Sequence, residues 1–241
     1  MMKKALFILS FGTGILSAQT STFITDADWL DPANWDTAAF VHDNQTAFIN
    51  ANAVVDRNTG NANVDNPSRI EIGSGPGISG SVTVTGGTLS GAHGGGNGIF
   101  VGVNGGTGTL RVEEGATYRS QGGTMQFAVG DFLGGTGFVS VAGVMQIYKF
   151  LNVNNGTFEM MPTGKCNLFN SNDPSSIGAE GTLSFVIDGS EVGSLERSNT
   201  NGLNLTIDAA ATLKINLGGS FEIDDSWTLM RYTSLSGQFK E

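Results

Sequence analysis

In-phase glycines in the middle of the chain limit its fold more than any other feature. Successive glycines in two separate sets are 28 or 29 residues apart: Gly73, Gly102 and Gly130, and Gly80, Gly108 and Gly137. A period of roughly 20 to 50 residues is typical of a solenoid or an array, in which each repeat buries its apolar face on its neighbour. Because two independent markers keep one period, we expect stacked repeats through this part of the chain.

The segments between these glycines have the pattern of short β-strands. Apolar residues alternate with small polar ones in three successive repeats: Val82 and Val84, Leu110 and Val112, and Val139 and Val141. This period of two is typical of a strand with one buried face, and the Gly-rich stretches between the strands allow sharp corners. We therefore predict an all-β chain that forms a parallel, right-handed β-helix, with strands of about four to six residues and coils stacked about 4.8 Å apart.

Two other all-β architectures fit the repeat less well. A propeller blade needs about 40 residues or more, and a sandwich would not produce in-phase glycines. Collagen is excluded because the 36 glycines among 241 residues show no three-residue period and there are only 5 prolines.

Nucleic acid is not an expected partner, because the chain has 12 Lys and Arg residues against 22 Asp and Glu.

The first residues have the pattern of a secretory signal peptide. Lys3 and Lys4 precede an apolar run that extends from Ala5 to Leu16 and ends in the small residues Ser17 and Ala18. This run is about a dozen residues long, whereas a membrane span needs about 20. We expect cleavage after Ala18, a mature chain with a formal charge of −12 from 10 basic and 22 acidic residues, and no membrane span.

A single cysteine, Cys166, rules out a disulfide within the chain despite the expected export. We interpret Cys166 as a small apolar core residue. Stability must then come from burial and backbone hydrogen bonding.

Specific motifs add a family resemblance. Residues 28–35 read Asp-Trp-Leu-Asp-Pro-Ala-Asn-Trp, and residues 43–49 follow the pattern D-x-x-x-A-x-I. Residues 81–89 read Ser-Val-Thr-Val-Thr-Gly-Gly-Thr-Leu. The chain resembles secreted bacterial β-solenoid surface proteins of the autotransporter-like and PEP-CTERM-sorted type, which share such a W-x-D-P-x-N-W motif and GTL-x-V-x-GGTL repeats. Residues 227–239 resemble their closing segment. The resemblance covers most of residues 28–239 and implies a structural or adhesive protein of the bacterial cell surface or extracellular matrix.

Together these patterns predict four regions. They are a signal peptide at 1–18, an N-terminal cap with its first strands at 20–66, repeated coils at 67–176, and C-terminal coils with a closing β segment at 177–241.

Trp29 and Trp35 lie in the cap region. They would either close the open end of the solenoid or form a flat platform for sugar rings, and we favour the cap.

Enzymatic chemistry is not expected from the acidic residues of the repeats. Glycoside hydrolysis needs two carboxylates across the scissile bond. Between Asn66 and Phe158 the only acids are Glu71, Glu113, Glu114 and Asp131, with no Asp-Asp or Asp-x-Asp pair. The pair Asp224-Asp225 reads as a solvated turn, and His42 and His93 lack the neighbours of a zinc site. We expect no catalytic, metal-binding or cofactor-binding residues; the alternative is a polysaccharide-binding module or a polysaccharide-degrading β-helix enzyme.

Binding surfaces are less specific in the sequence. Five threonines would line a flat face of the kind that binds ice or glycans, although Phe138 and Ser140 interrupt it: Thr83, Thr85, Thr88, Thr107 and Thr109. Threonine is also a common strand residue on a solvated face. The expected partners are extracellular polysaccharide, other surface proteins, and further copies of the chain that meet through the solenoid ends.

Overall fold

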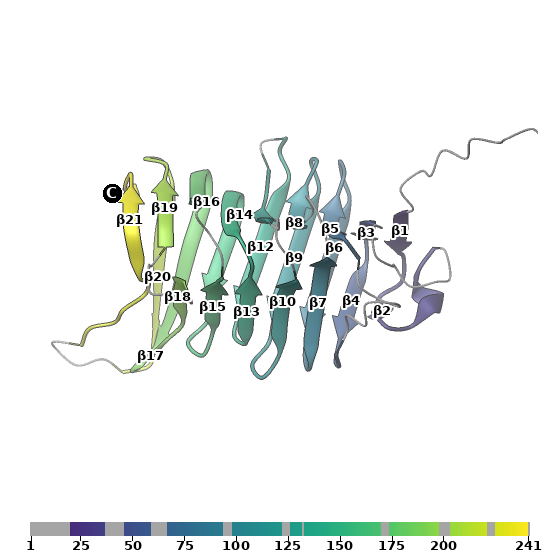
Figure 1. Cartoon of the computed structure of the whole chain (residues 1–241), viewed down its shortest axis with the longest axis horizontal. Helices are drawn as coiled ribbons and strands as arrows, with labels where there is room; N and C mark the ends of the chain where they lie inside the picture. The colour runs from purple at the N-terminus through teal and green to yellow at the C-terminus, as the bar shows by residue number, and fades with distance from the viewer. Residues whose placement is uncertain are drawn as a thin grey trace, which may run out of the picture.

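The computed structural model is an all-β solenoid of parallel strands, with about six turns, as the glycine period predicts. It describes residues 20–36, 46–58, 67–93, 98–121, 126–131, 133–169, 174–197, 203–220 and 225–240. The strands stack along the long axis of the molecule, from β1 at one end to β21 at the other (Figure 1). The predicted signal peptide, residues 1–18, lies outside the described residues.

The strands form three faces, which we call A, B and C. Face A contains β1 (Thr20–Phe23), β3 (Thr46–Ile49), β5 (Arg69–Ser74), β8 (Gly98–Val103), β11 (Gln126–Val129), the first parts of β14 (Phe150–Met160) and β16 (Ser175–Asp188), β19 (Leu203–Ile207) and β21 (Tyr232–Ser236). Face B contains β2 (Ala27–Asp28), β4 (Asn52–Val55), β6 (Ser79–Val84), β9 (Thr107–Val112), β12 (Thr136–Val141), the second parts of β14 and β16, and β20 (Thr212–Gly218).

Face C is the shortest stack. It contains β7 (Thr88–His93), β10 (Thr117–Gln121), β13 (Val144–Ile147), β15 (Lys165–Leu168) and β18 (Ser194–Arg197). Two further elements lie outside the three faces: the 3₁₀ turn η1 (Pro32–Asn34), and β17 (Glu191–Val192), which pairs antiparallel with the end of β16.

Every second residue of a strand is apolar, and its side chain points into the solenoid. On face B, for example, Val82, Leu110, Val139 and Phe158 are in register from coil to coil, and none of the four is exposed. Equivalent rows on the other faces join them in one hydrophobic core cluster that reaches from the first coil to the last. A chain without disulfides can be stable on this basis, because every coil covers the apolar surface of its neighbours.

The repeated glycines occupy equivalent positions in successive coils, as the sequence predicted. Gly80, Gly108 and Gly137 pair in register at the start of the face B strands. Gly102, at the end of a face A strand, has a φ of +67°. A Cβ atom at Gly102 would overlap the carbonyl group of Thr136 in the next coil, so both the backbone angle and the close approach of two chains require glycine.

Later coils differ from the predicted unit. The strands β14 and β16 have 11 and 14 residues, because each bends from face A into face B without an intervening loop. Gly137 pairs with Gly156, a much shorter step than 28 or 29 residues. The period therefore changes after the third coil of the repeat, while the stacking continues.

The predicted region boundaries are not breaks in the ladder. The strands β3 and β4, which belong to the predicted cap and entry region, pair with β5 and β6, so the ladder continues from residues 46–55 into the following coils. The boundary at 176/177 falls inside β16. Within the described residues, no helix is long and apolar enough to cross a bilayer.

Candidate functional site

The two tryptophans lie at the N-terminal end of the solenoid and pack on each other. Trp29 and Trp35 are 1% and 2% exposed, with ring centroids 5.1 Å apart in an edge-to-face arrangement. Phe23 of β1 completes the cluster, with its ring centroid 5.2 Å from that of Trp35. Trp35 Nε1 donates a hydrogen bond to the carbonyl oxygen of Trp29 at 3.1 Å. Because the rings are buried, neither presents a flat face to a sugar in this structure.

The same segment covers the backbone edge of the first strand. The backbone N–H of Asp36 donates to the carbonyl oxygen of Thr22, and the N–H of Thr22 donates to the Asp36 carboxylate, both at 2.9 Å. Ile24 N–H bonds to the carbonyl oxygen of Asn34 in the same way. Residues 34–36 thus occupy hydrogen-bonding groups that an uncovered end strand would leave free.

The C-terminal end of the solenoid is more open. In the described structure β20 pairs only with β16, and β21 pairs only with β19. Phe185 in β16 is fully buried, whereas Ile215, its partner in register on β20, is 40% exposed. The adjacent inward position, Leu217, is 62% exposed. The last coil therefore leaves part of the core row in contact with solvent.

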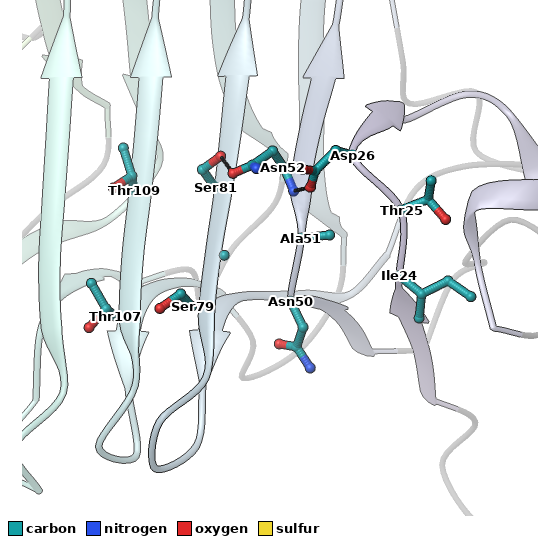
Figure 2. A pocket seen from close by; sticks show the side chains of 11 residues that line it. Ile24, Thr25, Asp26, Asn50, Ala51, Asn52, Ser79, Ser81, Thr107 and Thr109 are labelled. Carbon is teal, nitrogen blue, oxygen red and sulfur yellow. Dashed lines mark hydrogen bonds between the residues drawn. The ribbon is translucent and has the colours of Figure 1, made fainter.

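A polar hollow of about 680 Å³ lies on face B beside the N-terminal cap, and we call it the B-face hollow. Ser81 Oγ donates to Asn52 Oδ1 at 2.6 Å, and Asn52 N–H donates to Asp26 Oδ1 at 2.8 Å (Figure 2). Asn50 Oδ1 is buried and has no hydrogen-bond partner among the described residues. The side chains of this hollow are mostly small and polar, and its charged residue, Asp26, accepts a backbone hydrogen bond.

Only part of the threonine set that the sequence suggested lies in this hollow. Thr107 and Thr109 line it, on β9, next to Ser79 and Ser81 on β6 (Figure 2). Thr88, by contrast, begins a strand of face C. The five threonines therefore do not form one flat face.

A second hollow, of about 430 Å³, lies on face A, and we call it the A-face hollow. Its floor is a small apolar cluster outside the main core, formed by Phe100, Val103 and Ala128. Its polar walls come from strands and corners of several coils: Arg69, Asn104, Gln126, Asp131, Asn152, Asn154 and Ser176. An apolar floor with amide-rich walls distinguishes this hollow from the one on face B.

Side-chain contacts fix the charged groups around the A-face hollow. Arg69 stacks on Phe100, with its Cζ atom 4.0 Å from the ring centroid, and its Nε pairs with Glu71 Oε1 at 2.5 Å. Glu71 is only 5% exposed and also accepts a hydrogen bond from Ser74. Asn104 Nδ2 donates to the same Ser74 hydroxyl at 3.0 Å. These contacts place the Arg69–Glu71 ion pair on the outer side of face A.

Each of the two hollows is lined by one carboxylate. Asp131 lines the A-face hollow, and its carboxylate accepts backbone N–H groups of Asn104, Leu133 and Gly135. Asp26 lines the B-face hollow. Neither hollow is lined by two acids, and no group of three or more metal-ligating side chains occurs among the described residues.

Two titratable side chains lie in the hydrophobic core, outside both hollows. Cys166 is fully buried in the face C row between Met145 and Leu195, and burial raises the pKa of its thiol far above the usual value. Burial raises the pKa of Tyr118, in the same row, in the same direction. His42 and Asp224 lie outside the described residues.

Comparison of this chain with protein-family models, curated proteins and solved structures gave no match.

Both hollows were missed in the sequence because their residues are far apart in the chain. Asn152 and Ser176 are adjacent only through the register of β14 with β16. The available signal was the pair of outward polar residues Asn152 and Asn154 in one strand. Their partners in other coils could not be assigned once the repeat period changed.

Proposed function

We propose that this chain is a secreted, non-enzymatic scaffold of the bacterial cell surface or extracellular matrix, with a structural or adhesive role. The observation that carries the proposal is the parallel ladder from β1 to β21 around one apolar core. In such a ladder each coil is held by hydrogen bonds and burial on both sides, which makes a stiff rod that does not need disulfides.

The ends of the rod support the same role. Trp29, Trp35 and Phe23 fill the N-terminal end, and residues 34–36 occupy the edge of the first strand. A covered edge limits uncontrolled pairing between rods. The burial of both tryptophans supports a cap function for them rather than the sugar platform.

Export is part of the proposal and rests on the sequence of residues 1–18. Expression of the full chain in a bacterium should release a protein that begins at Gln19, as measured by intact mass and N-terminal sequencing of the extracytoplasmic fractions. Retention of the complete chain in the cytoplasm would contradict the secreted role.

The scaffold role itself predicts resistance of the folded chain to proteases. Trypsin should cleave the native protein slowly, because most of its Lys and Arg residues lie in or beside paired strands. Val139→Asp, which puts a charge into the core, should abolish this resistance, whereas Thr109→Asp at the adjacent outward row should retain it. Equal digestion of the wild type and Val139→Asp would contradict the proposal.

A polysaccharide-binding module is the second candidate, and the A-face hollow, with its apolar floor and amide-rich walls, is the observation that favours it. Binding would give the scaffold its adhesive function, because a long rod can present repeated weak contacts.

A further inference from the structure

The A-face hollow combines an apolar floor with polar walls on the outside of the solenoid. Outward positions of a solvated strand are usually polar, yet Phe100, Val103 and Ala128 are 8%, 4% and 6% exposed on this face. In register, Phe100 is next to Ala128, which is next to Asn152. An apolar floor therefore continues directly into an amide wall along the stacking direction.

The amides on this wall are only partly used in hydrogen bonds; the Asn154 NH₂ group donates to the carbonyl oxygen of Gly130 at 3.5 Å, which leaves its amide oxygen as an acceptor. Asn152 Oδ1 accepts a hydrogen bond from Ser176 Oγ at 2.8 Å, which leaves its NH₂ group as a donor. Asn154 lies one outward position further along β14. Gln126 is half-buried at the start of β11 and lies in register between Gly98 and Phe150. Side-chain amides offer both donors and acceptors, as sugar hydroxyl groups require.

The charges around the hollow favour a neutral ligand. Glu71 neutralises Arg69 at 2.5 Å, and the Asp131 carboxylate has three backbone N–H partners. Among the described residues that line the hollow, Arg69 is the only cation, and it is paired, so it does not favour a phosphate or a carboxylate. A β-strand ligand is also disfavoured, because the strands β8, β11 and β14 are paired on both sides and offer no free edge.

We propose that the A-face hollow binds a segment of a neutral polysaccharide, which lies along the stacking direction of the coils. The amides of Gln126, Asn152 and Asn154 bond to its hydroxyl groups, beside the largely buried apolar floor of the hollow. Successive coils present equivalent positions about 4.8 Å apart, so an extended polymer can contact several of them at once. This proposal names a ligand for the adhesive role proposed above, and it rests on that role for its biological purpose.

Isothermal titration calorimetry on the chain from Gln19 to Glu241 tests the proposal with three neutral probes: cellohexaose, maltohexaose and the hexamer of N-acetylglucosamine. A hexamer of galacturonic acid is the anionic arm. We expect at least one neutral hexamer to bind, and Gln126→Leu combined with Asn152→Leu to weaken it by about tenfold or more, since about 1.4 kcal/mol corresponds to a factor of ten. The matched control, Ser81→Ala with Thr109→Ala in the B-face hollow, should leave the affinity within about twofold.

Several results would overturn the proposal. They are failure of all three neutral hexamers to bind, stronger binding of the anionic hexamer, equal affinity of the A-face variant and the wild type, or loss of binding in the B-face control. Unfolding midpoints of all variants verify the fold, and the single substitution Gln126→Ala serves if the double variant does not fold. Export and protease resistance do not depend on this hollow. A failure of the binding proposal therefore leaves the scaffold proposal testable on its own.

Discussion

Replacing one repeat glycine by alanine tests whether the coils are held together by close backbone contact at the corners. Gly102 and Gly77 have similar backbone angles, with φ of +67° and +73°. A Cβ atom at Gly102 would overlap the carbonyl group of Thr136 in the next coil, whereas one at Gly77 would meet no atom within 4 Å. The two positions therefore share the strain of a left-handed backbone, and they differ in whether a new Cβ atom would meet the next coil.

The expected loss in the free energy of unfolding follows from these two terms. A left-handed conformation costs alanine about 1–2 kcal/mol, so Gly77→Ala should lose about that amount. Gly102→Ala should lose a further 1–3 kcal/mol or so, because the neighbouring coil can move away only by disturbing the paired strands on both sides. The total is about 2–5 kcal/mol.

Equilibrium unfolding in urea, followed by far-ultraviolet circular dichroism, measures both losses. The wild type, Gly77→Ala and Gly102→Ala should be compared at one protein concentration, together with their m-values. Equal losses for the two variants would refute the reasoning, since only strain and not coil contact would then matter at Gly102.

Three further predictions concern the cap and the buried titratable residues. Trp35→Ala should lower the free energy of unfolding, measured in urea, by about 3–5 kcal/mol, and Trp35→Phe should lower it by less because a ring remains. A loss below about 1 kcal/mol for the alanine variant would contradict a cap. The Cys166 thiol should not react with Ellman's reagent at pH 8 until the protein is denatured, because burial raises its pKa, and stoichiometric labelling of the native protein would contradict this. Because burial raises the pKa values of Cys166 and Tyr118, the folded state retains protons that the unfolded state loses. Stability should therefore fall as pH rises above about 8.5 for Cys166 and above about 10 for Tyr118, by up to about 1.4 kcal/mol per pH unit for each group. Cys166→Ala should flatten this fall between about pH 8.5 and 10, and a wild-type stability that is constant up to pH 10 would contradict the linkage.

The repeat part of the fold was predictable because its signals are local. In-phase glycines such as Gly108 and Gly137 mark corners, and alternation such as Leu110 and Val112 marks a strand with one buried face. Those two signals fixed strand type, parallel stacking and register for three coils. The right-handed sense of the helix stays a prediction.

The remaining coils were harder to predict because the signals disappear. The strand β14 bends between two faces without a glycine-rich loop, and the step from Gly137 to Gly156 is short. The predicted boundary at 176/177 therefore fell inside a continuous strand, β16. No local pattern distinguishes a long bent strand from two short ones when tertiary stacking supplies the partners.

The sequence by itself determined the architecture and the apolar interior, because strand alternation and glycine spacing are properties of neighbouring residues. Only the tertiary structure decided which outward side chains meet, as with Arg69, Phe100 and Asn152 on face A. It also decided that Trp29 and Trp35 are buried. The physical reason is that such contacts depend on the register between coils and on loop lengths that vary along the chain, so residues far apart in sequence become neighbours only when the strands stack.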